Sequence, residues 1–404
     1  MLLVELHVTR DAVFLFGVRP DRDEPEIADV PLGRDDVRDL VATARAPLTG
    51  DHGALGAALA DRRLVGLLAP VADWAEPGEL VYLVPHDALH LLPLHAVPVG
   101  GVPLAERHPV AYSPSASVLR YCRAKSTGRR SSALVMADPG HGGPLVFVRE
   151  QALAVAGHFG DAEVLSGRSV KRSRMSKLGS YDVLHIAAHG VFDAEDPMNS
   201  GIELADGRFT AQDFLNLSLD VDLVTLGACE TGLSGRQPGD ELVGLTRALL
   251  YAGAPSVLVT LWRVDELSTS MLLTRFYAQL TEGCPKVHAL QRAQSWLRER
   301  TIGDVLSFAR EARGRRGLDD VSVGAVDLEV AALHMAGRDF AAAEELYETI
   351  RARPGLTAEQ AGAARVGSLQ ARLMRDQPAA SDLDRRVFDD PYHWAPFVLV
   401  GDWW

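Results

Sequence analysis

Short apolar runs alternate with amphipathic stretches through the second half of the chain. Apolar runs at 133–137, 164–165, 182–188, 222–228 and 256–262 predict buried strands. Helical periodicity separates or follows these runs, at 149–159, 170–178, 211–215, 240–251, 267–280 and 286–300. This alternation predicts an α/β fold with a mostly parallel sheet that carries helices on both faces.

The first part of the chain also carries strand patterns. Residues 4–18 alternate like a β-hairpin, and 79–84 and 110–113 are candidate strands. Residues 35–68 have helical periodicity interrupted by Pro47 and Gly50, and 91–97 is expected to be a short extended piece. We expect an N-terminal lobe at 1–130 that completes the sheet, followed by a second unit at 131–404.

An interval at about 301–386 interrupts the α/β pattern, before strand character resumes at 395–400. A basic run at 310–317 is expected to be an exposed loop, and 327–335 and 340–351 predict a helical hairpin. The hairpin resembles half of a tetratricopeptide unit at Gly337, Phe340, Ala343, Tyr347 and Pro354. One such unit cannot bury its own apolar face, so the insertion should pack on the α/β core.

Composition narrows the classes of function. The 404 residues carry a net charge of −13, which disfavours binding to nucleic acid. The basic group Lys171, Arg172, Arg174 and Lys177 is interpreted as a solvated helix face. No apolar run approaches the ~18 residues of a membrane helix, and the N-terminus lacks signal-peptide features. Three cysteines without a CxxC pair fit a reducing compartment, so we expect a cytoplasmic protein without a membrane partner.

Two of the predicted strands end in residues with complementary chemistry. One is followed by His189 and Gly190, and the next along the chain by Cys229. Sites in open parallel sheets form at the carboxyl ends of strands, so both side chains should share one rim. A thiol becomes a nucleophile when a nearby base takes its proton. The backbone N–H groups of Gly190 and Cys229 could then stabilise an oxyanion.

Each of these residues alone has a simpler interpretation. A single cysteine at a strand end is more often buried packing, and a histidine before a glycine is usually a turn residue. Because a histidine and a cysteine occur together at the ends of neighbouring strands, the sequence favours a catalytic role for His189 and Cys229. Cys122 and Cys284 are expected to be structural.

The sequence resembles the CHAT domain family, caspase-like peptidases often found beside tetratricopeptide repeats. The resemblance rests on VLHIAAHGVFD at 183–193, on 200–232 with its GACETG, on 239–266, and on 392–403. It implies the clan of caspases and separase, with His189 and Cys229 as catalytic pair, Gly190 and Cys229 as oxyanion hole, and a degenerate caspase-like N-terminal lobe. The family often joins its last helix to the terminal strand by a short link, whereas about ninety residues intervene here. A role in bacterial defence or regulated cell death is what the family suggests.

The segment after the strand at 256–262 is expected to line the substrate pocket, through Trp262, Asp265 and Glu266. The two carboxylates would favour a basic residue before the cut, whereas Arg263 would favour an acidic one. Asp265 also fits a helix N-cap. Asp193 and Glu230 are candidates for a third catalytic residue, although a surface role suits each better.

Other classes of function fit less well. His86, His90 and His95 cluster, but His185 and His189 do not share a helical face and no HExxH motif exists, so no metal and no cofactor are expected. No serine-hydrolase elbow or phosphate-binding loop occurs.

The favoured function is a cysteine endopeptidase that cleaves a protein or peptide, with a regulatory protein partner as one option. The alternative is a catalytically silent, caspase-like interaction module that acts through its helical insertion.

Overall fold

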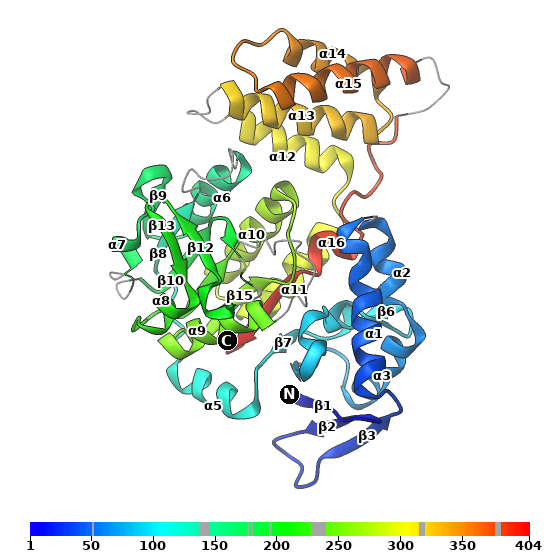
Figure 1. The fold of residues 1–404 in the computed structure, drawn as a ribbon, viewed down its shortest axis with the longest axis vertical. Coiled ribbons are helices and arrows are strands. Elements are labelled where there is room, and N and C mark those ends of the chain that lie inside the picture. The colour runs from blue at the N-terminus through cyan, green and yellow to red at the C-terminus, as the bar shows by residue number, and fades with distance from the viewer. Residues whose placement is uncertain are drawn as a thin grey trace.

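The computed structural model describes residues 1–50, 52–137, 146–175, 178, 181–191, 193, 196–227, 240–314, 320–375 and 381–404. Within these residues, one large sheet runs through the molecule and a helical segment projects from one end (Figure 1). Its strands are β1 (Leu2–Val8), β2 (Val13–Val18), β3 (Glu26–Val30), β4 (Val81–Val84), β7 (Val110–Tyr112), β8 (Ser132–Ala137), β9 (Asp161–Ser166), β10 (Val183–Ala187), β14 (Leu223–Leu226), β15 (Ser256–Thr260) and β16 (Phe397–Gly401).

The sheet joins the two halves of the chain. Its 11 described strands follow the order β3-β2-β1-β4-β7-β16-β15-β14-β10-β8-β9. Most neighbouring pairs are parallel, and β1–β2, β2–β3 and β15–β16 are antiparallel. β16 comes last in the chain but lies in the middle of the sheet, between the strands of the N-terminal half and β15. The mostly parallel sheet predicted from the pattern is confirmed.

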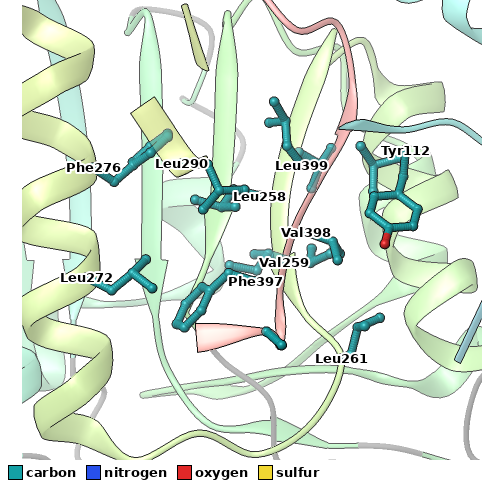
Figure 2. Close-up of a cluster of buried hydrophobic side chains, with 14 of the residues drawn as sticks. Tyr112, Leu258, Val259, Leu261, Leu272, Phe276, Leu290, Phe397, Val398 and Leu399 are labelled. Atoms are coloured by element: carbon teal, nitrogen blue, oxygen red, sulfur yellow. The ribbon is translucent and has the colours of Figure 1, made fainter. Parts of the chain in front are cut away.

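Helices cover the sheet. Those outside the insertion are α1 (Arg34–Arg45), α2 (Leu55–Leu59), α3 (Arg62–Trp74), α4 (Leu104–Arg107), α5 (Ala116–Lys125), α6 (Val146–Ala156), α7 (Arg172–Met175), α8 (Ala211–Leu215), α9 (Asp240–Ala252), α10 (Glu266–Thr281), α11 (Lys286–Arg298) and α16 (Pro391–Trp394). Figure 2 shows Leu272 and Phe276 of α10 beside Leu258 and Phe397 of the sheet. α9 packs against β15 from the other face.

The described part of the insertion contains four helices, two more than the pattern predicts: α12 (Ile302–Gly314), α13 (Asp320–Ala336), α14 (Phe340–Arg351) and α15 (Ala358–Arg375). An isolated antiparallel bridge between Thr301 and Arg386 closes its base. Val305 of α12 and Val326 of α13 belong to the main core, so the expected packing on the α/β core is confirmed. Tyr347 and the other residues of a second, smaller core hold α13, α14 and α15 together.

Two local expectations are wrong. The run at 310–317 is helical as far as Gly314, because Ala309 and Ala312 are buried and hold α12 against its neighbours, and 315–317 lie outside the described residues. The piece at 91–97 is not extended but forms 3₁₀ turns, Asp87–Leu91 and Leu94–Ala96, on either side of Pro93. The buried Leu94 and Ala96 make this segment look like a strand in the sequence.

Candidate active site

His189 lies two residues beyond the end of β10, at the carboxyl edge of the sheet. It is half-buried, and its carbonyl accepts the N–H of Glu203 at 2.8 Å. The chain then enters β11 (Gly190–Val191), which pairs antiparallel with β12 (Gly201–Leu204); β13 (Gly207–Thr210) completes this small sheet. The small sheet thus fixes the backbone on the far side of His189.

Cys229 and Ala228 lie outside the described residues, so the structure describes only the strand that leads to them. That strand, β14, is the direct parallel neighbour of β10, and its register pairs Ile186 with Leu226. The ladder continues by one more bond, from the N–H of Gly227 to the carbonyl of Ile186 at 2.8 Å. The prediction that the two strands are adjacent and parallel is therefore confirmed.

A buried polar group lies on β10, four residues before His189. The ring of His185 is fully buried, and its Nδ1 lies 3.2 Å from the Tyr277 hydroxyl of α10. That hydroxyl donates to Thr225 Oγ1 of β14 at 2.7 Å, so His185 Nδ1 is the donor to Tyr277. Burial lowers the pKa of His185 to about 4, which keeps the ring neutral. The group links β10, β14 and α10 beneath the rim.

Of the two acids considered beside His189, one lies in the described part. The Asp193 carboxylate accepts the N–H of Asp196 at 3.0 Å and the side-chain N–H of Asn199 at 2.8 Å. These bonds hold the loop that leads into β12. Glu230 lies outside the described residues.

The segment predicted to line the substrate pocket follows β15, the neighbour of β14 on the side away from β10. Trp262 is buried, and its indole N–H donates to the carbonyl of Tyr392 at 3.1 Å. Asp265 caps α10 by accepting the N–H groups of Leu267 and Ser268, so the capping role considered for it is confirmed. Its side chain is still one-third exposed.

Glu266 connects this segment to α6, since its carboxylate accepts the N–H of Phe147 at 3.2 Å. The first turns of α6 and α10 therefore meet at the same edge of the sheet as His189.

Glu329 is an acidic neighbour that the sequence pattern did not indicate. It lies on α13, and desolvation, followed by the charge of Asp265, raises the pKa of its carboxyl group. Its side chain is nevertheless exposed to solvent. The charge of Asp265 thus acts on a carboxylate of the insertion, and no local pattern could reveal an electrostatic interaction between elements so far apart in sequence.

The histidines of the N-terminal half have separate structural roles. His86 Nδ1 accepts the N–H of Val8 at 3.0 Å, and burial lowers the pKa of His95 to about 3. Among the described residues, no three His, Cys, Asp or Glu side chains come together in a way that could hold a metal ion.

The basic group is held by acidic side chains, since Arg172 and Arg174 form ion pairs with Asp213 and Glu163. None of the described helices has the length and apolar character to cross a bilayer.

Three comparisons relate the chain to known proteins. A family model described as the CHAT domain matches residues 57–402. Tetratricopeptide repeat protein 28 of Mus musculus is 46% identical over 74 residues, 18% of this chain and 3% of that protein. The Homo sapiens protein of the same name is 26% identical over 225 residues, 46% of this chain and 9% of that protein. The chain spans less than a tenth of these relatives.

The fold is similar to that of separase. The Saccharomyces cerevisiae separase–securin structure superposes with a TM-score of 0.51 at 10% identity, over 73% of this chain and 28% of that chain. The Arg-specific cysteine proteinase gingipain R gives a TM-score of 0.42 at 10% identity, over 91% of this chain and 74% of that one. The first of these likenesses supports a caspase-like fold.

Proposed function

Because the chain belongs to the CHAT domain family, we propose that it is a cysteine endopeptidase in which Cys229 attacks the substrate and His189 takes its proton. The observation that carries this proposal is the register of β10 and β14. Ile186 pairs with Leu226, and His189 and Cys229 each follow their paired residue by three positions. Opposite positions on neighbouring strands lie about 4.8 Å apart, a spacing that lets a histidine and a cysteine side chain meet.

The faces of the two strands support the same pairing. His185 and Thr225 are opposite each other and both contact Tyr277, so they lie on the α10 face. His189 and Cys229 each follow this pair by four positions in the sequence. Cys229 is also only two residues from Gly227, which keeps its Cα within about 7.6 Å of the Gly227 Cα.

The mechanism proceeds by acyl transfer. The thiol of Cys229 passes its proton to His189, and the thiolate attacks the peptide carbonyl carbon. The tetrahedral intermediate collapses, the C–N bond breaks, and His189 returns the proton to the leaving amine. Water then attacks the thioester with His189 as base, which releases the acid product and restores the thiol.

The backbone around Gly190 supports a role in stabilising the oxyanion. Because Glu203 donates to the carbonyl of His189, Gly190 and Ile202 form a non-hydrogen-bonded pair of the antiparallel ladder. The N–H of Gly190 therefore points away from β12. Together with the N–H of Cys229 it would donate to the oxyanion, the arrangement that acyl transfer requires.

For specificity we propose a preference for a basic residue before the cut, with Trp262, Asp265 and Glu266 lining its pocket. The supporting observation is electrostatic. Asp265 keeps one-third of its side chain exposed while capping α10, and the charge of Asp265 reaches Glu329 of the insertion. A bound Lys or Arg side chain would relieve the part of the raised pKa of Glu329 that comes from the charge of Asp265.

Regulation by a protein partner is part of the same proposal. α13 packs against α6, and the first turn of α6 is held by Glu266. A partner bound to the insertion would therefore act on elements that carry the substrate segment. The alternative, a silent interaction module, is favoured by one observation, the apolar outer face of α15 described below.

The test is cleavage of a peptide library varied at the residue before the cut, by the full chain and by Cys229→Ala and His189→Ala. We expect cleavage after Lys or Arg, and a loss of about a thousandfold or more in each variant. A wild-type protein that neither cleaves nor reacts at Cys229 with a peptide-based thiol electrophile would favour the silent module. Cleavage that survives in Cys229→Ala would rule out the proposed nucleophile.

A further inference from the structure

α15, the last helix of the insertion, has its small residues inside and its large ones outside. Apart from Gln360 near its start, the face that packs on the rest of the insertion consists of the small residues Ala364, Gly367, Ser368 and Ala371. These small residues let α14 approach closely. A Cβ added at Gly367 would come within 2.4 Å of the Tyr347 ring.

The opposite face carries three large apolar side chains. Val366 is 52% exposed, Leu369 is 58% exposed and Leu373 is 70% exposed. Their spacing of three and four residues puts them in one stripe along the helix. At 100° per residue, this stripe is centred on the side directly opposite the small residues. Solitary exposed leucines are ordinary, but no other described helix exposes three large apolar side chains.

The stripe lies at the open end of a helical stack. The inner helices α12 and α13 join the main core, while α14 and α15 share the smaller core around Tyr347. Figure 1 shows α15 on the part of the insertion away from the sheet. Helical stacks end in helices with a polar outer face when nothing packs on them. The large apolar face of α15 is instead the surface that a further helix in such a stack would cover.

One flank of the stripe is basic. Arg365 and Arg372 lie on this side, with Arg375 further round the helix. Arg372 and Arg375 pair with Glu344 of α14, at 2.8 and 2.9 Å. Arg365 makes no ion pair within the part of the chain that the structure describes. Because Arg372 also pairs with Glu348 at 3.3 Å, Arg365 is the positive charge beside the stripe that is left for a partner, and it suits an acidic residue there.

The size of the stripe favours a different chain over a second copy of this one. Three side chains of this kind expose on the order of 300 Å² of apolar surface, whereas a stable dimer buries about 800 Å² on each partner. Two facing copies would also bring like charges together in the antiparallel arrangement. We propose that the outer face of α15 binds an amphipathic helix of a partner protein, with an apolar stripe of matching spacing and acidic residues along its flank.

The experiment uses the full chain and two synthetic helical peptides of three heptads with the same leucine stripe. One peptide carries glutamate beside the stripe and the other lysine. Binding is measured by fluorescence anisotropy to the wild type, to Leu369→Glu/Leu373→Glu and to Arg365→Glu. Ile27→Glu, at another exposed apolar residue (62% exposed), is the matched control.

We expect the glutamate peptide to bind the wild type and the control equally. Its affinity should fall by about tenfold or more in the double variant and by severalfold in Arg365→Glu. The net charge of −13 would favour the lysine peptide in any non-specific binding. A preference for the glutamate peptide would therefore show that it binds at the basic flank of α15. Equal binding of both peptides, equal binding to the double variant, or no binding would overturn the proposal. So would a wild-type dimer that the double variant abolishes, since the occupant would then be a second copy.

Discussion

At the scale of single residues, the candidate site rests on a buried group that carries no charge. His185 donates to Tyr277, Tyr277 donates to Thr225, and all three are enclosed between the sheet and α10. A charged imidazole there would lose its hydration without gaining an acidic partner, which is why its pKa is depressed. The group ties together the two strands that precede His189 and Cys229.

Stability should therefore fall with pH in a defined window. The folded chain does not protonate His185 until about pH 4, while the unfolded chain takes up the proton near 6.5. Between these values the unfolded state binds more protons, so stability present at pH 7 is lost as pH falls. Urea titrations at pH 7 and 5 should show a loss of about 2 kcal/mol from this residue. The loss should shrink by that amount in His185→Asn; an unchanged pH dependence in the variant would contradict this assignment.

Asp265 has two roles that a pair of substitutions separates. Asparagine caps a helix as well as aspartate but has no charge, whereas alanine removes both properties. We expect Asp265→Asn to leave the melting temperature unchanged and to lower kcat/KM for peptides with Lys or Arg before the cut by about tenfold. Asp265→Ala should in addition destabilise the protein by about 1 kcal/mol. Unchanged specificity in Asp265→Asn would limit this residue to capping.

At the scale of elements, the two strands that lead to the site are anchored at their starts. Asp182 precedes β10 and accepts the N–H of Ser131 at 2.8 Å, and Asp222 precedes β14 and accepts the N–H of Gly128 at 2.9 Å. Lys286 of α11 lies 2.8 Å from Asp222, and neither side chain is exposed. The linker between α5 and β8 is thereby fastened to both strands, which fixes their relative register.

Removal of the buried lysine should be costly. Lys286→Met leaves the Asp222 carboxylate without its cation, so we expect a loss of about 3–5 kcal/mol in unfolding free energy. The matched control is Arg351→Met, which breaks the exposed pair with Glu348 and should cost less than about 1 kcal/mol. Chemical denaturation of both variants measures the difference. Equal, small losses would show that Asp222 does not depend on Lys286.

Elements with a strong local pattern could be predicted from the sequence. The apolar runs of β10, β14 and β15 and the periodic helices α8 and α14 appear where expected. The helix of 310–314 could not, because its glycine and arginine content hides the buried alanines that stabilise it. At the site, His189 and Cys229 are indicated by strand ends, whereas Tyr277 and Glu329 reach it only through packing of distant elements.

At the scale of the whole molecule, β16 couples the two halves. It pairs with β15 over five residues and, at Val400, with Tyr112 of β7. The strands of the N-terminal half thus belong to the same sheet as those of the candidate site. β16 follows the insertion along the chain, so this central strand of the sheet comes after all the other strands in the sequence.

A substitution that destabilises β16 should also destabilise the strands of both halves. Leu399 is fully buried, and Leu399→Ala should cost about 2–5 kcal/mol. Hydrogen exchange should then accelerate in β4 of the N-terminal half as well as in β10. If only β10 and its neighbours lose protection, the two halves unfold independently and the coupling through β16 is absent.

The central claim, that Cys229 is a nucleophile activated by His189, is tested most directly by alkylation rates. Cys122 is buried, and desolvation raises its pKa to about 11, so this thiol should react slowly with iodoacetamide near pH 7. Mass spectrometry of the wild type and His189→Ala gives the rate at each cysteine. We expect Cys229 to react at least about tenfold faster than Cys122 and Cys284, and His189→Ala to abolish the difference. A Cys229 no faster than Cys284, or one unaffected by His189→Ala, would contradict it.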